Sequence, residues 1–277
     1  MTIEEFLQEI ITVFKKVGIE NPKLEAELLA CHVLSCTRSH LLVAQNEEIP
    51  DKVLLASAAL INERCKRRPL QYVIGKTEFY GMDIAVDERV LIPRPETEEL
   101  VQAALEDMKE KNAPSVLDLC TGSGCIAIAV AANKKDAAVT ASDFSIKAYQ
   151  LARVNARPYE NIKVVRGDLF HELGSFDYIL TNPPYIPSAT IKKLQTEVKD
   201  FEPAMALDGG KDGLDIIKRI IDEAPLHLNE GGQIFMEIGD DQGEALLRLA
   251  NESGQYKDCR IIKDINGQDR IFRATKK

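Results

Sequence analysis

The first seventy residues place hydrophobic side chains at steps of three and four, which is the spacing of one face of an amphipathic helix. The first such run consists of Ile3, Phe6, Leu7, Ile10, Phe14 and Val17. Thr2 and Glu5 have the spacing of a capping box at its start, and Gly18 follows its end. Further helices are expected after Asn21-Pro22 and near Pro50-Asp51. The pattern predicts a small helical domain over residues 1–75.

The pattern changes after Pro69 to short stretches of alternating polar and apolar residues between Thr77 and Ile92. Gly81 and the acidic pair Asp87-Glu88 interrupt this alternation, as turns do between strands. Residues 76–92 are therefore expected to form a β-hairpin that connects the helical domain to the rest of the chain.

From Pro114 onward, short apolar stretches alternate with helix-like stretches. The apolar stretches are Val116–Leu119, Val139–Ser142, Lys163–Val165, Tyr178–Leu180 and Ile234–Met236. This alternation predicts an α/β domain over residues 93–277, with a mostly parallel, Rossmann-like sheet and helices on both faces. Near the end of the chain, Asn266-Gly267 separates Cys259–Lys263 from Arg270–Arg273 and is a strong hairpin signal. The sheet is thus expected to end in an antiparallel edge.

The composition is that of an ordinary globular protein, with 45% hydrophobic and 29% charged residues. The 35 Lys and Arg against 44 Asp and Glu give a net charge of −9, a poor match to a protein that binds nucleic acid mainly by counterion release. The apolar run Ile126–Ala132 is far shorter than the roughly 18 residues that indicate a membrane span. Met1–Ile10 has three glutamates and no basic stretch before an apolar core, so we expect a cytoplasmic protein without a secretory signal.

Two local clusters raise other functions. Cys31, His32, Cys36 and His40 lie close together, but their C-x4-C spacing lacks the tight C-x2-C of a zinc site, so no metal site is predicted. The basic residues 64 and 66–68 end a predicted helix, where cations suit the helix dipole. We interpret this run as a solvated helix end, with a patch for partner docking as the alternative.

A glycine-containing loop follows the first predicted strand of the α/β domain, over Asp118–Gly124. Gly122 and Gly124 allow a ligand to approach the backbone closely, and the helix that follows offers its N-terminal N–H groups. Because Ala127 stands where the dinucleotide fingerprint has its third glycine, a position at which it also allows alanine, the loop alone does not decide the cofactor. A tight turn without a ligand is the structural alternative.

Acidic residues follow the next two strands at the same expected sheet edge. Asp143 comes 19 residues after Gly124, about where a carboxylate binds ribose hydroxyls, although it could instead cap the helix that starts near Ser145. Asp168, with Leu169 beside it, is a candidate for contact with an adenine ring, or else it caps a turn.

The fourth strand runs directly into Asn182-Pro183-Pro184-Tyr185. Two prolines remove two backbone donors, so the Asn182 side-chain oxygen and the Pro183 carbonyl can act together as acceptors for an NH2 group. Tyr185 offers a flat face on which a planar amide or base can stack. The alternative is a rigid proline turn without a ligand.

Together, Asn182–Tyr185 and Asp118–Gly124 resemble the S-adenosylmethionine-dependent methyltransferases that modify planar nitrogens, both adenine and amide N-methyltransferases. A further stretch, Leu91–Glu98, is similar, with Pro69–Tyr72 and the N-terminal helices, to the release factor glutamine methyltransferases, and this resemblance covers essentially the whole chain. In that family the methyl group goes to the side-chain amide nitrogen (N5) of the glutamine in the Gly-Gly-Gln motif of class 1 peptide chain release factors. The resemblance implies S-adenosylmethionine as the cofactor and a release factor as the partner, and we expect a monomer.

The resemblance also implies roles for individual residues. The cofactor would contact Cys120, Thr121, Gly122, Ser123 and Gly124 through its methionine part, Asp143 through its ribose, Asp168 and Leu169 through its adenine, and also Asn182. The glutamine side chain would contact Asn182, Pro183, Pro184 and Tyr185, of which Asn182, Pro183 and Tyr185 would be catalytic. Cys120 departs from the glycine of many relatives, and Leu169 from the aromatic residue of some.

Three other interpretations remain open at this point. An adenine N6-methyltransferase acting on nucleic acid would need a basic channel, which the net charge of −9 does not favour. A protein that binds S-adenosylmethionine without transferring a methyl group would have no use for the converging acceptors at Asn182 and Pro183. Gly231-Gly232-Gln233 copies the substrate motif, but a turn before the apolar strand Ile234–Ile238 explains it better than self-methylation.

Overall fold

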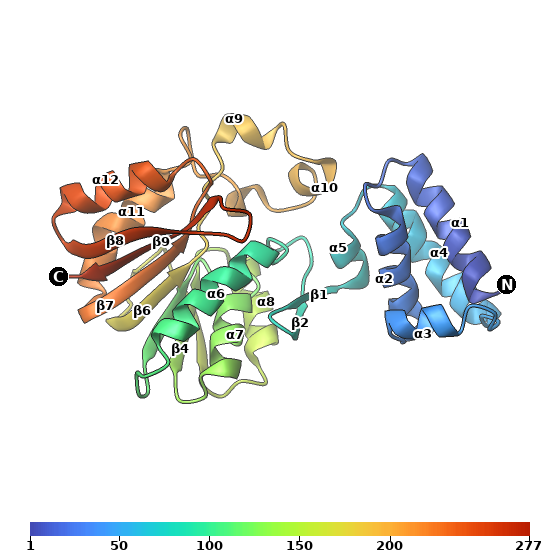
Figure 1. Cartoon of the computed structure of the whole chain (residues 1–277), viewed down its shortest axis with the longest axis horizontal. Helices are drawn as coiled ribbons and strands as arrows, with labels where there is room; N and C mark the ends of the chain where they lie inside the picture. Colours follow the sequence, from blue (N-terminus) through green and yellow to red (C-terminus); the bar gives the residue numbers. More distant parts are fainter. The chain divides into compact units, whose positions relative to one another are not determined.

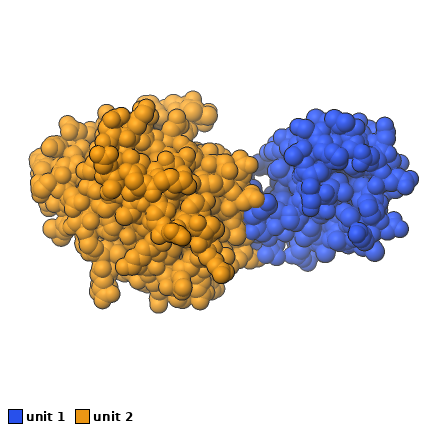
Figure 2. All heavy atoms as spheres, turned by 90° about the horizontal axis from the view of Figure 1, so that it is seen from below, with its two compact units in different colours: residues 1–76, 195–201 blue, residues 77–194, 202–277 orange.

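A computed structural model describes all residues of the chain, 1–277, and divides it into two units, which Figure 2 colours blue and orange. Unit 1 consists of Met1–Lys76 and Gln195–Phe201, and unit 2 of Thr77–Leu194 and Glu202–Lys277. The inclusion of residues 195–201 in unit 1 is not apparent from the sequence, because this segment lies more than a hundred residues after the N-terminal helices. The chain therefore leaves unit 2 after Leu194 and re-enters it at Glu202.

Unit 1 is helical. Its helices are α1 (Ile3–Lys16), α2 (Pro22–Leu34), α3 (Arg38–Val43), α4 (Asp51–Cys65), α5 (Leu70–Ile74) and the short α10 (Thr196–Lys199). The predicted capping box is present: the Thr2 hydroxyl accepts from the Glu5 backbone N–H, and the Glu5 carboxylate accepts from the Thr2 N–H. The buried face of α1, with Phe6, Ile10 and Phe14, packs in one core with α2. The helical spacing in the sequence thus identified the core of this unit.

The basic residues 64 and 66–68 at the end of α4 were expected to form a solvated helix end, and this expectation is wrong for the arginines that pair with Glu197. The Arg64 side chain is only 3% exposed and pairs with Glu25 and with Glu197 of α10. Arg67 donates to both oxygens of Glu197, at 2.7 Å each. Only Lys66 matches the expectation, since it is exposed and pairs with Glu63 one turn earlier. The arginines were misassigned because their acidic partner Glu197 lies about 130 residues away in the sequence.

A two-stranded hairpin follows, formed by β1 (Lys76–Phe79) and β2 (Met82–Ala85). Tyr80 and Gly81 both have positive φ at its turn, as a type I′ turn requires. The predicted hairpin is present, but it is shorter than residues 76–92, because strand pairing ends at Ala85 and the chain then continues without regular structure to the start of α6.

Seven strands form the sheet of unit 2, in the order β5-β4-β3-β6-β7-β9-β8 (Figure 1). Their bounds are β3 (Ser115–Leu119), β4 (Ala138–Asp143), β5 (Ile162–Arg166), β6 (Phe176–Thr181), β7 (Leu228–Glu237), β8 (Tyr256–Lys263) and β9 (Asp269–Lys276). The strands from β5 to β7 are parallel, whereas β9 runs antiparallel to β7 and to β8. The predicted parallel sheet with an antiparallel C-terminal edge is therefore confirmed.

Helices cover both faces of this sheet, as Figure 1 shows. One face carries α6 (Pro95–Asp107), α7 (Cys125–Asn133) and α8 (Ile146–Ala156), and the other carries α11 (Asp215–Glu223) and α12 (Gly243–Ser253). The remaining elements are the short helices α9 (Ser188–Ile191), η1 (Ala204–Ala206) and η2 (Ala224–Leu226). α7 is apolar on nearly all sides because it is buried between α6, α8 and the sheet. None of the helices has the length and apolar character needed to cross a membrane.

The strand order explains where a ligand can bind. The chain proceeds outward from β3 to β4 and β5, and then returns to form β6 on the other side of β3. In open α/β sheets such a reversal leaves a crevice beyond the carboxyl ends of the strands. The glycine loop after β3, Asp143 at the end of β4 and Asn182 after β6 all lie at this edge.

Candidate active site

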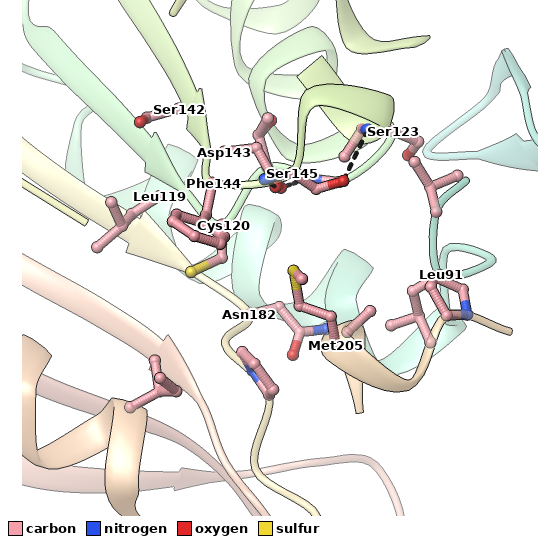
Figure 3. A pocket seen from close by; sticks show the side chains of 18 of the residues that line it. Leu91, Leu119, Cys120, Ser123, Ser142, Asp143, Phe144, Ser145, Asn182 and Met205 are labelled. Atoms are coloured by element: carbon pink, nitrogen blue, oxygen red, sulfur yellow. Dashed lines mark hydrogen bonds between the residues drawn. The ribbon is translucent and has the colours of Figure 1, made fainter. Parts of the chain in front are cut away.

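A cavity of about 530 Å³ lies in unit 2 at the carboxyl ends of β3, β4 and β6 (Figure 3). Its wall includes the glycine loop, the residues after β4 and Asn182. Two further segments, one around Leu91 and one around Met205, complete the wall. The glycine loop, Asp143, Asp168 and part of the Asn182–Tyr185 turn, which the sequence predicted to lie together, therefore line one cavity.

The glycine loop is held by hydrogen bonds to the neighbouring strand. The Thr121 N–H donates to the Ser142 carbonyl at 2.9 Å, and the Gly122 N–H donates to the Asp143 carboxylate at 2.8 Å. Both Gly122 and Gly124 have positive φ, and a Cβ at Gly124 would press against Ala152 of α8 at 3.5 Å. Glycine at position 124 thus serves both the turn and the packing of the loop onto α8.

Cys120 adopts a positive φ of 61°, a conformation that favours glycine. A glycine would fit there without strain, so Cys120 occupies a position that the backbone favours for glycine. Burial, followed by the nearby charge of Asp143, raises the pKa of the Cys120 thiol, and burial raises the pKa of Cys125 to about 12. Both thiols of the cavity wall are therefore protonated at neutral pH.

Asp118 supports the loop from beneath the cavity. It is fully buried, and its Oδ2 atom accepts from the Thr121 hydroxyl and from the Ala127 N–H, the latter at 3.0 Å. Its other oxygen has no partner. Burial raises the pKa of Asp118 to about 7, although the two hydrogen bonds act in the opposite direction.

Asp143 uses both carboxylate oxygens to organise the cavity wall. One accepts from the Gly122 N–H and the other from the Ser145 N–H, each at 2.8 Å. Asp143 is not the N-cap of α8, because the Ser145 hydroxyl takes that role by accepting from the Ala148 N–H. Burial raises the pKa of Asp143, and its remaining lone pairs are available to a ligand in the cavity.

The two residues expected to contact adenine lie in the cavity wall, but they differ in their surroundings. Leu169 is buried and has a positive φ of 47°. Asp168 is half exposed, and its carboxylate accepts two hydrogen bonds from Arg219 of α11, at 3.2 and 3.0 Å. Arg219 also lines the cavity and was not identified in the sequence.

The Asn182–Tyr185 turn contributes to the cavity with only part of its length. Asn182 and Pro184 line the wall, whereas Pro183 is buried and neither it nor Tyr185 is among the lining residues. The Asn182 side-chain NH2 donates to the Thr97 hydroxyl at 3.1 Å. The Tyr185 hydroxyl donates to the buried Glu237 at 3.2 Å, and burial with this nearby charge raises the pKa of Tyr185.

Several residues that hold this turn were missed in the sequence. Gln242 donates from its side chain to the Tyr185 carbonyl at 3.0 Å. Gly209 and Gly213 pack against the same turn, since a Cβ at Gly209 would lie 2.8 Å from the Pro184 carbonyl. The glycines at 209, 210 and 213 were a usable signal, and so was the acid Glu237 at the end of an apolar strand next to β6.

Two exposed hydrophobic side chains at the cavity were also missed. Phe144, which directly follows Asp143, is 55% exposed, and Met205 is 57% exposed. Figure 3 shows both among the side chains around the cavity. Apolar groups left in water at the wall of a concave site are suited to cover a planar ligand.

Comparison with known proteins extends this description. The PrmC N-terminal domain family matches residues 5–75, and the methyltransferase small domain family matches residues 99–198. A release factor glutamine methyltransferase of Geobacter sulfurreducens is 40% identical over 98% of this chain and 95% of its own length. Another, from Thermodesulfovibrio yellowstonii, is 42% identical over 90% of both chains.

Solved structures share the fold at low sequence identity. A methyltransferase from Pyrococcus furiosus has a TM-score of 0.51 and 21% identity, covering 80% of this chain and 98% of its own. The hMettl16 catalytic domain in complex with the MAT2A 3'UTR hairpin 6 has a TM-score of 0.60 and 16% identity, covering 75% and 80%. These similarities show a class I methyltransferase fold.

Proposed function

Since this chain belongs to the release factor glutamine methyltransferases, we propose that it transfers a methyl group from S-adenosylmethionine to the N5 amide nitrogen of the glutamine in the Gly-Gly-Gln motif of class 1 peptide chain release factors. One observation carries the chemical part of this proposal. Asn182 lies in the wall of the same cavity as the glycine loop, with its NH2 group turned to Thr97, so its oxygen is free to accept from a substrate amide.

The cavity fits S-adenosylmethionine in size and in its polar groups. About 530 Å³ lies within the range of small-molecule sites. A Cβ at Gly122 would meet no atom within 4 Å, so the backbone there is open to a ligand. Asp143 can accept from ribose hydroxyls, and Leu169 and Phe144 can cover the adenine.

When bound, S-adenosylmethionine supplies a methyl group on a positively charged sulfur; attack by a nitrogen breaks the bond between this sulfur and the methyl carbon and leaves S-adenosylhomocysteine as the second product. The substrate amide nitrogen is a poor nucleophile, because its lone pair is delocalised into the carbonyl. The Asn182 oxygen in the cavity wall would accept one of its N–H hydrogens, and the Pro183 carbonyl, whose residue does not line the cavity in this structure, would accept the other once the substrate is bound. The two bonds would orient the nitrogen and stabilise positive charge as it develops. No strong base is needed, because the nitrogen becomes acidic once it is methylated and can release its proton to solvent.

The cavity also suppresses competing reactions. A thiolate is a better nucleophile than an amide, and Cys120 and Cys125 both lie in the cavity wall. Burial keeps both thiols protonated at neutral pH, since it raises the pKa of each. The substrate amide therefore competes with no thiolate of the cavity wall for the methyl group.

The alternative function, an adenine N6-methyltransferase acting on nucleic acid, would use the same cavity. Two observations favour a protein substrate over a nucleic acid. Residues 5–75 match the PrmC N-terminal domain family, and the net charge is −9. We further propose that the protein acts as a monomer in the cytoplasm, where release factors function.

The proposal is tested by incubating the purified protein with labelled S-adenosylmethionine and a class 1 release factor. The matched control is the same factor with its motif glutamine changed to alanine. Label on the first and not on the second is the expected result. Label on neither, with transfer to DNA or RNA supplied in parallel, would overturn the proposed substrate and support the alternative.

A further inference from the structure

Three hydrogen bonds connect Asn182 in the cavity wall to the interior of unit 2. The Asn182 side-chain nitrogen donates to Thr97 of α6 at 3.1 Å. The Thr97 hydroxyl donates to Glu237, at the end of β7, at 2.6 Å. Tyr185 donates to the other oxygen of Glu237 at 3.2 Å. Thr97 is 2% exposed and Glu237 is 1% exposed, so water does not compete for these bonds.

The direction of each bond follows from the groups involved. Thr97 and Tyr185 each donate to a different oxygen of Glu237, so the single hydroxyl proton of Thr97 is committed to Glu237. The Thr97 oxygen can then only accept, and the end of the Asn182 amide that faces it must be the NH2 group. The Asn182 oxygen is consequently left for the cavity.

This direction matters because an asparagine amide has two ends of nearly the same size. If the amide were turned over, its NH2 group would meet the NH2 group of the substrate glutamine, and two donors would face each other. A device that holds the amide in one orientation is therefore needed for an amide substrate. The hydrogen bonds from Asn182 to Thr97, from Thr97 to Glu237 and from Tyr185 to Glu237 hold the amide in this way.

We propose that Thr97 and Glu237 are positioning residues for methyl transfer, which hold the Asn182 side-chain oxygen toward the substrate amide. This inference rests on the proposed function, which supplies the amide substrate. Neither residue needs to touch the reacting atoms, because both act through Asn182. Tyr185 completes the chain by satisfying the second oxygen of Glu237.

Glu237 is surrounded by groups that keep the carboxylate in place. Burial raises the pKa of Glu237, and the nearby carboxylate of Glu96 on α6 acts in the same direction. The hydrogen bonds from Thr97 and Tyr185 and the guanidinium of Arg270 on β9 act in the opposite direction. Arg270 itself donates to the Ile238 carbonyl, one residue after Glu237. The positive charge of Arg270 therefore offsets part of the cost of burying this acid.

The test compares Thr97→Val, Thr97→Ser and Glu237→Gln with the unchanged protein. Valine keeps the shape of threonine without its hydroxyl, and we expect kcat to fall about 100-fold, as for a misplaced reacting group, with an unchanged Kd for S-adenosylmethionine. Serine keeps the hydroxyl and should retain most of the rate. Glutamine keeps the shape of Glu237 but can face Thr97 with either end, and we expect kcat to fall about 10-fold without a loss of thermal stability.

The outcomes separate a positioning role from a structural one. Full kcat in Thr97→Val, an equal loss in Thr97→Ser, or a loss that follows thermal stability or cofactor binding would overturn the inference. If the unchanged protein methylates no release factor, the proposed function fails by itself. The inference is then decided by NMR of the Asn182 side-chain NH2, whose protons should exchange slowly with water in the unchanged protein and faster in Thr97→Val.

Discussion

The carbonyl oxygen of Tyr185 lies within the space that a Cβ atom would occupy at Gly213. The loop that contains Gly213 therefore packs directly on the backbone of the Asn182–Tyr185 turn. Gln242 joins the two segments, since its side-chain nitrogen donates to the Tyr185 carbonyl at 3.0 Å and to the Gly213 carbonyl at 3.3 Å. The backbone of Gly213 thus packs against the Tyr185 carbonyl, which only a residue without a Cβ allows. The position of Asn182 in the same turn depends on this close approach.

We expect Gly213→Ala to reduce kcat by about 10- to 100-fold, because the added Cβ would displace the turn by a fraction of an ångström. Its φ of +76° adds strain to the same substitution. Gly254→Ala is the matched control, since Gly254 has a φ of +66° but no atom within 4 Å of the added Cβ. Steady-state methylation of a release factor measures both variants, and equal rates for the two would show that the contact with Tyr185 is unimportant.

Asn182→Ala removes the acceptor that is expected to act on the substrate amide. We expect turnover to fall about 100-fold, as for the loss of one preorganised electrostatic group. The Kd for S-adenosylmethionine, measured by calorimetry, should change much less, because Asp143 and the glycine loop remain. Normal turnover in this variant would remove Asn182 from the proposed mechanism.

Asp143 and Asp168 are expected to differ in their effect on cofactor binding. Asp143 is mostly buried and already fixed by two N–H donors, so Asp143→Ala should weaken binding by about 10- to 100-fold through loss of hydrogen bonds to a charged group. Asp168 is half exposed and paired with Arg219, so Asp168→Ala should weaken binding only a few-fold. A larger loss at Asp168 than at Asp143 would contradict the proposed arrangement of the cofactor.

The sequence predicted the parts of the site that obey a general rule of the fold. The loop after β3, Asp143 and Asn182 each follow a strand, and the carboxyl ends of parallel strands meet at one edge, so their convergence could be foreseen. The residues that hold them could not, because their contacts depend on tertiary packing. Thr97 and Glu237 are 140 residues apart, and nothing local marks them as partners. Arg64 was misjudged for the same reason.

The raised pKa of Asp118 predicts a pH dependence of stability. Burial raises its pKa from 3.8 to about 7, so the stability gained from protonation is fully present below pH 3.8 and is lost as the pH rises through 7. Asp118→Asn does not titrate, so its free energy of unfolding relative to the unchanged protein should rise by up to about 1.4 kcal/mol per pH unit between pH 5 and 7. Urea unfolding of both proteins at several pH values measures this difference. A difference that is constant with pH would show that Asp118 is ionised throughout.

Glu197 is expected to stabilise unit 1, because it accepts hydrogen bonds from both Arg64 and Arg67. Glu197→Gln leaves Arg67 without its carboxylate and the buried Arg64 with Glu25 alone. The free energy of unfolding should fall by about 2 kcal/mol, less than when a buried charge loses its only partner. Amide hydrogen exchange along α4 and α10 measures this loss, with Glu63→Gln as the matched control, since Glu63 pairs with the exposed Lys66 and, at 3.6 Å, with the partly exposed Arg68. Because Lys66 remains in water when that pair is broken, α4 should exchange unchanged in the control, and equal effects of the two substitutions would mean that burial of Arg64 does not depend on Glu197.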